Sequence, residues 1–448
     1  MNAKYLLTGF FLISILPGFI SCKKYLDAKP DSNLSTPSTL DDLQSLIDNS
    51  NILNDAITLT NEGADEFYLT DADWAATGNP NQAGYVWDPA TEAKDDWSVQ
   101  YKSVLYANTV LENLLKITSQ GQEEKWKNIK GAALFFRANH FYQLAQQFAP
   151  PYDHNSASTA LGIPLRLSSD FNKPSARSTV EQTYNQVIND LLEAAPLLPV
   201  RPLHKTRPGR ATAFALLARV YLQMGEYTKA REYASTSLEG YSTLIDYNEL
   251  DAGAVDPLPI FNDEVLFYAS NISSIIPYYG KVDSVLYRSF DANDLRKTIF
   301  FQDNGDGSFS FKTSYNGSIY DMFQGIATDE LYLTRAECYA RAGNTNAALQ
   351  DLNTLLIKRW KAGTFAPFTA ASPKEALSLI LQERKKELVL RGTRWSDLRR
   401  LNPDPEWAVT LKRVINGKEY TLPPNDLRYT LLIPREVINL TGIPQNKR

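Results

Sequence analysis

A mainly α-helical fold is predicted by three features: apolar stripes at helical spacing, a helical hairpin, and a second hairpin that repeats it. The first hairpin is the segment 211–238, in which small and apolar residues recur three to four positions apart. Gly225 interrupts this stripe, and glycine is favoured where a helix ends in the left-handed conformation. Glycine, tyrosine and alanine at such offsets are typical of a tetratricopeptide helix pair. The residues concerned are Phe214, Ala218, Tyr221, Gly225, Ala230 and Leu238.

The second hairpin lies 118 residues further along the chain. Most of its matching residues are identical to those of the first, and one exchanges phenylalanine for tyrosine: Tyr332, Ala336, Tyr339, Gly343, Ala348 and Leu356. One helical hairpin cannot bury its own apolar face, so we expect both hairpins to belong to one stacked platform of helix pairs. The alternative is that two unrelated amphipathic pairs share these offsets by coincidence.

The N-terminus is predicted to be a lipoprotein signal peptide. Lys4 gives it a positive charge, an apolar run covers residues 6–20, and a small residue precedes Cys22. The run is too short and too interrupted for a membrane span. Residues 1–21 are therefore expected to be removed, with Cys22 lipidated and residues 22–35 forming a tether. An ordinary secretory signal, with Cys22 unmodified or removed, is the alternative.

A single domain is predicted over residues 36–448. Thr36-Pro37 opens a first helix. Helical repeats are expected near 97–148, 178–238 and 331–401, and irregular insertions rich in loops near 61–96, 240–318 and 402–432. Two capping boxes mark helix starts, one formed by Ser178 with Glu181 and one by Ser372 with Glu375. The second of these helices is expected to run to about Arg391.

A small β-hairpin is expected inside the second insertion, where 298–301 and 309–312 flank an acidic, glycine-rich turn. The turn places glycines at two of the first three ligand positions of a calcium loop, so no metal site is predicted there. Cys338 lies between residues of an apolar stripe and is expected to be a buried, inert thiol.

Segments in order along almost the whole chain resemble the SusD/RagB family of surface lipoproteins from Bacteroidetes-type bacteria. The motif ERKKELVLRGTRWSDLRRL at Glu383–Leu401 is the most specific. The others are CKKYLD at Cys22–Asp27, GAALFFRANHFYQLAQQFAPPY followed by LGIPLRL, STVEQTYNQVINDLLEAAPLLP, GRATAFALLARVYLQMGEYTKA, Asp294-Leu295-Arg296, and the closing LLIPREVINL.

This resemblance implies a helical platform of tetratricopeptide-like pairs with additions rich in loops. It also implies a protein that is attached to the outer membrane by its lipid anchor and faces the cell exterior. Such a protein caps a SusC-type TonB-dependent transporter as a lid, binds oligosaccharides or sometimes peptides, and delivers them. The chain is short for the family, so some insertions that carry ligand contacts are expected to be trimmed.

Catalysis and nucleic-acid binding find little support in the sequence. The net charge of −5 lacks the basic excess of a nucleic-acid-binding protein. His140, His154 and His204 show no metal-ligand spacing, and no nucleophile elbow is present. Nothing in the sequence places two carboxylates across a cleft as a glycosidase requires. No catalytic residue, metal or cofactor is therefore predicted.

The segment 383–401 carries the densest charge in the chain. An anion site is one interpretation, and it would use Arg391, Arg394, Arg399 and Arg400. The preferred interpretation is structural, because Glu383, Arg384 and Glu387 lie three to four positions apart on one helix. Opposite charges at this spacing stabilise a helix by about 0.2–0.5 kcal/mol per pair. Trp395 is expected to belong to the core.

Ligand binding is predicted in the irregular insertions. Sugar rings combine apolar faces with polar rims, so their sites need flat aromatic side chains beside hydrogen-bonding groups. The candidate residues are Asp71, Asp73, Trp74, Asn79, Asn81, Tyr85, Trp87, Tyr278 and Tyr279. The alternative is that these rings pin the loops onto the helices, with Trp87 the first candidate for burial.

Three functions remain open. The first is a nutrient-binding lid of an outer-membrane transporter, without enzymatic activity. The second is a helical-repeat scaffold for protein partners that binds no small molecule. The third is a surface glycosidase.

Overall fold

The computed structural model describes residues 37–119, 121–272 and 274–448. The predicted signal peptide, the lipidation site Cys22 and the tether lie outside the described residues. Residues Thr39–Arg448 form one compact unit. Within the described residues, no helix combines the length and the apolar character needed to cross a membrane.

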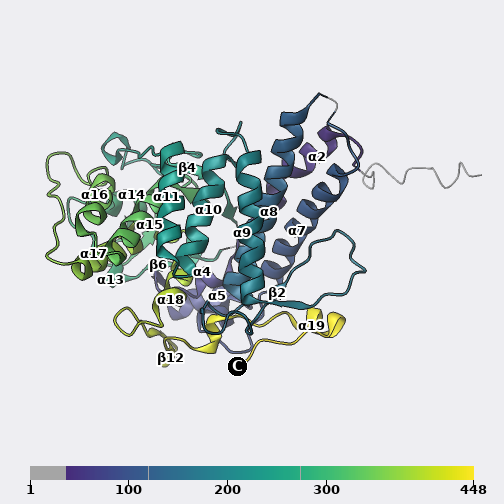
Figure 1. Ribbon diagram of the computed structural model, residues 1–448. Coiled ribbons are helices and arrows are strands. Elements are labelled where there is room, and N and C mark those ends of the chain that lie inside the picture. Colours follow the sequence, from purple (N-terminus) through teal and green to yellow (C-terminus); the bar gives the residue numbers. More distant parts are fainter. Residues whose placement is uncertain (1–36, 120, 273) are drawn as a thin grey trace, which may run out of the picture. The chain divides into compact units, whose positions relative to one another are not determined.

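A row of long helices forms the platform of this unit. Figure 1 shows α7 to α11 side by side; each packs on the next, and α11 continues the row to α15. Helix α15 packs in turn against α16 and α17. The prediction of a mainly α-helical fold is confirmed. The bounds of these helices are α7 Lys94–Leu114, α8 Glu123–Phe148, α9 Val180–Leu197, α10 Arg210–Gln223, α11 Tyr227–Gly240, α15 Thr328–Arg341, α16 Thr345–Leu356 and α17 Pro373–Glu387.

The two predicted hairpins are α10–α11 and α15–α16. Gly225 and Gly343 adopt φ values of 76° and 81° between their helices, as the repeat requires. The alanines of both apolar stripes have no exposed surface, so the paired helices approach closely: Ala218, Ala230, Ala336 and Ala348. Helix α11 packs on α15, which brings the two hairpins together in one platform as expected.

Several helix ends differ from the sequence-based prediction. Helix α9 is capped by Thr179 with Gln182, one residue after the predicted box, because the Ser178 hydroxyl donates instead to the Ile163 carbonyl at 2.7 Å. Ser372 caps α17 as predicted, but this helix ends at Glu387. Helix α2 (Leu40–Ile47) begins after Thr39, which forms its own capping box with Asp42, and not at Thr36-Pro37.

The insertions contain short strands. The predicted hairpin is present as β7 (Phe301–Asp303) with β8 (Phe309–Phe311), in a four-stranded sheet of order β1-β6-β8-β7. Its first strand begins at Phe301 and not at residue 298, because residues 298–300 belong to helix α14. A second hairpin, β11 (Leu411–Ile415) with β12 (Lys418–Leu422), lies in the region expected to be irregular. The other strands are β1 Phe67–Tyr68, β2 Leu161–Pro164, β3 Arg177–Thr179, β4 Val265–Phe267, β5 Ser270–Asn271, β6 Lys281–Val282, β9 Met322–Phe323 and β10 Ile326–Ala327.

Short helices order the insertions and the segments next to them, including the segment 61–96. A helix of one or two turns is too short to show an apolar period, which is why the sequence does not reveal them. They are α3 Ser50–Leu53, α4 Leu59–Glu62, α5 Asp71–Thr77, α6 Asn81–Tyr85, η2 Tyr247–Glu249, α12 Ile276–Tyr279, α13 Ser284–Ser289, α14 Arg296–Phe300, α18 Arg394–Leu401, η3 Leu427–Tyr429 and α19 Arg435–Thr441.

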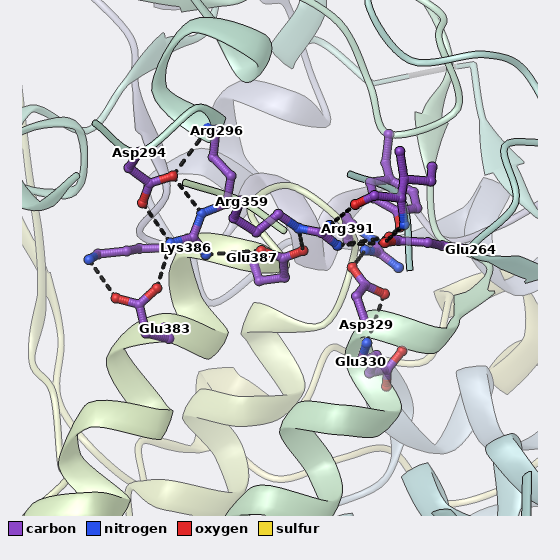
Figure 2. Close-up of polar contacts among 12 residues, drawn as sticks. Glu264, Asp294, Arg296, Asp329, Glu330, Arg359, Glu383, Lys386, Glu387 and Arg391 are labelled. Atoms are coloured by element: carbon purple, nitrogen blue, oxygen red, sulfur yellow. Dashed lines mark hydrogen bonds and ion pairs between the residues drawn. The ribbon is translucent and has the colours of Figure 1, made fainter. Parts of the chain in front are cut away.

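A buried ion-pair network joins the insertion 240–318 to the platform (Figure 2). Arg296 contacts Asp294, Glu383 and Glu387, with the Glu387 carboxylate 2.9 Å from its Nη1 atom. Arg359 bridges Glu387, at 2.7 Å, and Glu264, at 2.8 Å. Because these side chains come from the residue before β4, the start of α14, helix α17 and the segment after α16, the network ties four distant segments together.

The charged segment 383–401 has the structural role that the sequence favours, but through other partners. Arg391 pairs with Asp329, Arg394 with Asp65, and Arg400 with Glu337. Arg399 donates to the carbonyls of Gln146 and Ala149 at the end of α8. Glu383, Arg384 and Glu387 do not pair with one another as expected, but reach across to Arg296, Asp397 and Arg359. Within the helix, Glu383 pairs with Lys386 at 2.7 Å.

Candidate functional site

A cleft of about 840 Å³ opens where the first insertion meets the platform. This volume falls in the range of sites for small ligands. Its walls come from the segments 55–59, 79–83 and 88–99, together with Asn271 and Arg435. The cleft is therefore built from an insertion, the first turns of α7, strand β5 and the start of α19.

Asp96, in the first turn of α7, fixes one wall of the cleft. Its two carboxylate oxygens accept hydrogen bonds from the backbone N–H groups of Thr58, at 2.9 Å, and Leu59, at 3.0 Å. Asn271 of β5 holds the same wall from the other side, because its amide donates to the Ala56 carbonyl at 2.8 Å. Residues 56–59 are thus held in place by groups from two separate elements.

Burial changes the acidity of two carboxyl groups in the cleft. Desolvation raises the pKa of Asp55 to about 6 and that of Asp96 to about 6, although backbone N–H groups favour the ionised form of each. Asp55 also raises the pKa of Asp96 by charge repulsion. Both carboxyls are therefore ionised at neutral pH and gain protons as the pH falls through about 6.

The structure places two of the predicted ligand residues, Asn79 and Asn81, in the wall of this cleft. Asp71 and Asp73 have local partners: Asp71 accepts a hydrogen bond from the Asn416 N–H, and Asp73 from the Thr70 hydroxyl. Trp74 is partly buried, and its indole N–H donates to the Gln82 carbonyl at 3.1 Å. These three side chains therefore stabilise the loop, and none of them lines the cleft.

Tyr85 and Trp87 lie in the core, 1% and 5% exposed. Their rings enclose the guanidinium of Arg413, whose central carbon lies 3.6 Å and 4.7 Å from the two ring centroids. The Trp87 indole N–H also donates to the Gly63 carbonyl at 2.9 Å. Tyr85, Trp87 and Arg413 line a separate cavity of about 240 Å³ near β1 and β11.

Tyr278 and Tyr279 lie on α12, which packs against α5. Tyr278 is 60% exposed, and its ring centroid lies 6.1 Å from that of Tyr320, which is 55% exposed. Tyr320 precedes β9, the strand that pairs with Asn271 of β5 in the cleft wall. Tyr320 thus lies two residues before a strand that is paired with the cleft wall.

The sequence-based prediction missed Tyr320, Asp55, Asp96 and Arg435. Tyr320 lies just beyond the predicted insertion, and the Asn316-Gly317 turn before it is the signal that could have identified an exposed loop. Asp96 lies at a helix start rich in acidic residues. Acidic residues are common in the first turn of any helix, so the sequence gives no sign of a site there. Arg435 lies more than 300 positions after the wall residues 55–99, and no local pattern brings it there.

A cluster of three buried carboxylates lies apart from the cleft. Oxygens of Glu264, Asp329 and Glu387 lie within 4.8 Å of one another, as in a metal site. However, Arg359 contacts Glu264 and Glu387, and Arg391 contacts Asp329. The arginines supply the positive charge that the carboxylates require, so we assign this cluster to the ion-pair network.

Comparisons with known proteins agree with this architecture. A family model described as "Starch-binding associating with outer membrane" matches residues 24–222, and the SusD family model matches residues 328–430. SusD-like protein P2 from Formosa agariphila is 23% identical over 378 residues, covering 68% of this chain and 71% of that protein.

Solved structures show the same fold. A SusD superfamily protein from Bacteroides thetaiotaomicron aligns with a TM-score of 0.75 at 24% identity, covering 92% of this chain and all of its own. A protein from Bacteroides vulgatus, described as a "Putative sugar binding protein", aligns with a TM-score of 0.74 at 21% identity, covering 92% of this chain and 99% of its own. A laminarin-binding SusD-like protein aligns with a TM-score of 0.66 at 18% identity, covering 90% and 97%. With both family models matched in order on one platform, the chain belongs to the SusD/RagB family.

Proposed function

We propose that this protein binds oligosaccharides at the cleft and at the tyrosine pair, and that it does so without chemical turnover. The observation that carries the proposal is the pair Tyr278 and Tyr320, two exposed rings 6.1 Å apart and inclined by 31°. Exposed aromatic faces at this spacing suit the apolar face of a sugar ring, while Asn79, Asn81 and the acidic cleft wall suit its hydroxyls. The relatives described as binding sugar or laminarin support the same ligand class.

The proposed setting is the cell surface. The match to a family model described as associating with the outer membrane supports attachment there. The proposed anchor is a lipid on Cys22. We propose further that the protein acts as the lid of a SusC-type TonB-dependent transporter and passes its ligand to the channel. A stable lid requires an interface of roughly 2,000 Å² or more.

Removing both tyrosine rings is expected to weaken saccharide binding without affecting the fold. In the double variant Tyr278→Ala/Tyr320→Ala, the affinity for a bound oligosaccharide should fall about tenfold or more, because the sugar loses its stacking surface. Calorimetric titration with laminari-, cello- and malto-oligosaccharides measures this. Phe171→Ala is the matched control, since Phe171 is 83% exposed and does not line the cleft.

Other outcomes would contradict the proposal. Saturable binding of oligopeptides but of no saccharide would make the ligand a peptide. Binding of neither would favour a scaffold for protein partners. Release of reducing sugar by the purified protein would show a glycosidase.

A further inference from the structure

The cleft carries an excess of negative charge. Five carboxylates line it against two cations, namely Asp55, Asp88, Glu92, Asp95 and Asp96 against Lys94 and Arg435. Glu92 and Arg435 form a pair at 3.7 Å. Four aspartates therefore face a single lysine.

Three of the four aspartates accept hydrogen bonds from neutral backbone N–H groups. Asp96 accepts two backbone N–H groups, and Asp55 and Asp88 accept one each, from Ala56 and Ala90. In the described part of the chain, none of the cleft's four aspartates has a lysine or arginine nitrogen within 4.0 Å. By contrast, the buried carboxylates of the network in Figure 2 are paired with arginines.

We propose that the cleft selects its saccharide by charge: it takes uncharged or amino-bearing sugars and rejects those that carry carboxylate or sulfate groups. This inference rests on the proposed function. Its physical basis is that like charges brought together at a partly desolvated site oppose binding, so the aspartates discriminate through repulsion. Burial raises the pKa of Asp55 and Asp96 only to about 6, so both remain charged at neutral pH.

The test compares ligands that differ in charge and little else. Laminari-, cello- and malto-oligosaccharides are titrated into the full mature protein at pH 7, each beside the same oligosaccharide oxidised at C6 to the uronate. A glucosamine oligomer and a sulfated oligosaccharide complete the set. Each uronate is expected to bind at least about tenfold more weakly than its neutral parent, and this gap should shrink as salt screens the charges.

The double variant Asp55→Asn/Asp88→Asn tests whether the cleft causes this gap, because it removes two charges while keeping the size of both side chains. The ratio of neutral to uronate affinity is expected to fall at least about threefold in this variant. The ratio should not change in Asp263→Asn, since the Asp263 side chain is 80% exposed and does not line the cleft.

Equal or tighter binding of a uronate or sulfated ligand by the unmodified protein would overturn the inference and leave the proposed function standing. An unchanged ratio in the double variant would also overturn it. If no saccharide of any charge binds, the proposed function fails and the inference fails with it.

Discussion

Glu387→Ala is expected to lower the free energy of unfolding by about 3–5 kcal/mol, the cost of removing one partner from a buried ion pair. Glu387 has no exposed surface and holds both Arg296, at 2.9 Å, and Arg359, at 2.7 Å. The variant leaves two buried guanidinium groups without this partner. Denaturation monitored by circular dichroism measures the loss.

The pKa of Glu387 gives the sign of the pH dependence. Burial raises this pKa, but attraction by Arg359 and Arg296 outweighs burial, so the pKa lies below its ordinary value. The stabilisation is therefore present above the pKa of the unfolded state and is lost as the pH falls through the lower, folded value. The difference between the unmodified protein and Glu387→Ala should be larger at neutral than at strongly acidic pH.

Glu406→Ala is the control for this effect. Glu406 also pairs with a cation, Lys374 at 2.9 Å, but the side chains of Lys374 and Glu406 are 73% and 39% exposed. Exposed pairs contribute about 0–1 kcal/mol, so this variant should unfold almost as the unmodified protein does. A loss for Glu387→Ala as small as that for Glu406→Ala would show that the network contributes little to stability.

Trp395→Ala is expected to lower the free energy of unfolding by about 3–5 kcal/mol, as large-to-small changes in a core do. Trp395 is 3% exposed and packs on Tyr429 with ring centroids 4.8 Å apart. The Gly63 backbone lies so close that a Cβ atom there would be 2.9 Å from the ring. The truncation therefore leaves a cavity where the α4 turn, α18 and η3 meet.

Tyr320→Ala is the matched control for Trp395→Ala, because it removes an aromatic ring that is 55% exposed. Its stability should stay within about 0.5 kcal/mol of the unmodified protein, as is usual for surface positions. Thermal denaturation of both variants gives the comparison. A Trp395→Ala variant that melts normally and yet fails to bind saccharide would contradict the structural role of this ring.

The helical frame could be predicted from the sequence because its signals are local. Apolar residues recur with a period of 3.6 residues from Phe214 to Leu238 and again from Tyr332 to Leu356. The glycine within each stripe marks the end of a helix. The first helix of each hairpin is a continuous run in the chain. Its apolar face is therefore visible before any partner is known.

The cleft could be predicted only in part, because its groups come from distant parts of the chain. Tyr85 and Trp87 lie in a loop rich in glycine and proline, where aromatic rings resemble exposed ligand contacts. Arg413, which they enclose, lies 328 positions after Tyr85. A partner so far along the chain cannot be predicted from a local pattern. Asn79 and Asn81 of the same loop do line the cleft.

The role of the charged segment 383–401 could also be predicted only in part. Its spacing correctly favours a structural role, since Arg391, Arg394 and Arg400 are each paired with a carboxylate. The partners could not be predicted, because they belong to α15 and to the insertion that contains Asp65. The spacing of charges along a helix predicts which side chains are neighbours on that helix. It does not predict contacts with other helices.

Hydrogen–deuterium exchange with and without a bound oligosaccharide tests the central claim, that a helical frame holds a separate saccharide cleft. The expected result is slower exchange in residues 79–99, 274–279 and 318–321, with no change in the hairpins α10–α11 and α15–α16. Slower exchange confined to those hairpins, with the cleft segments unaffected, would contradict the account.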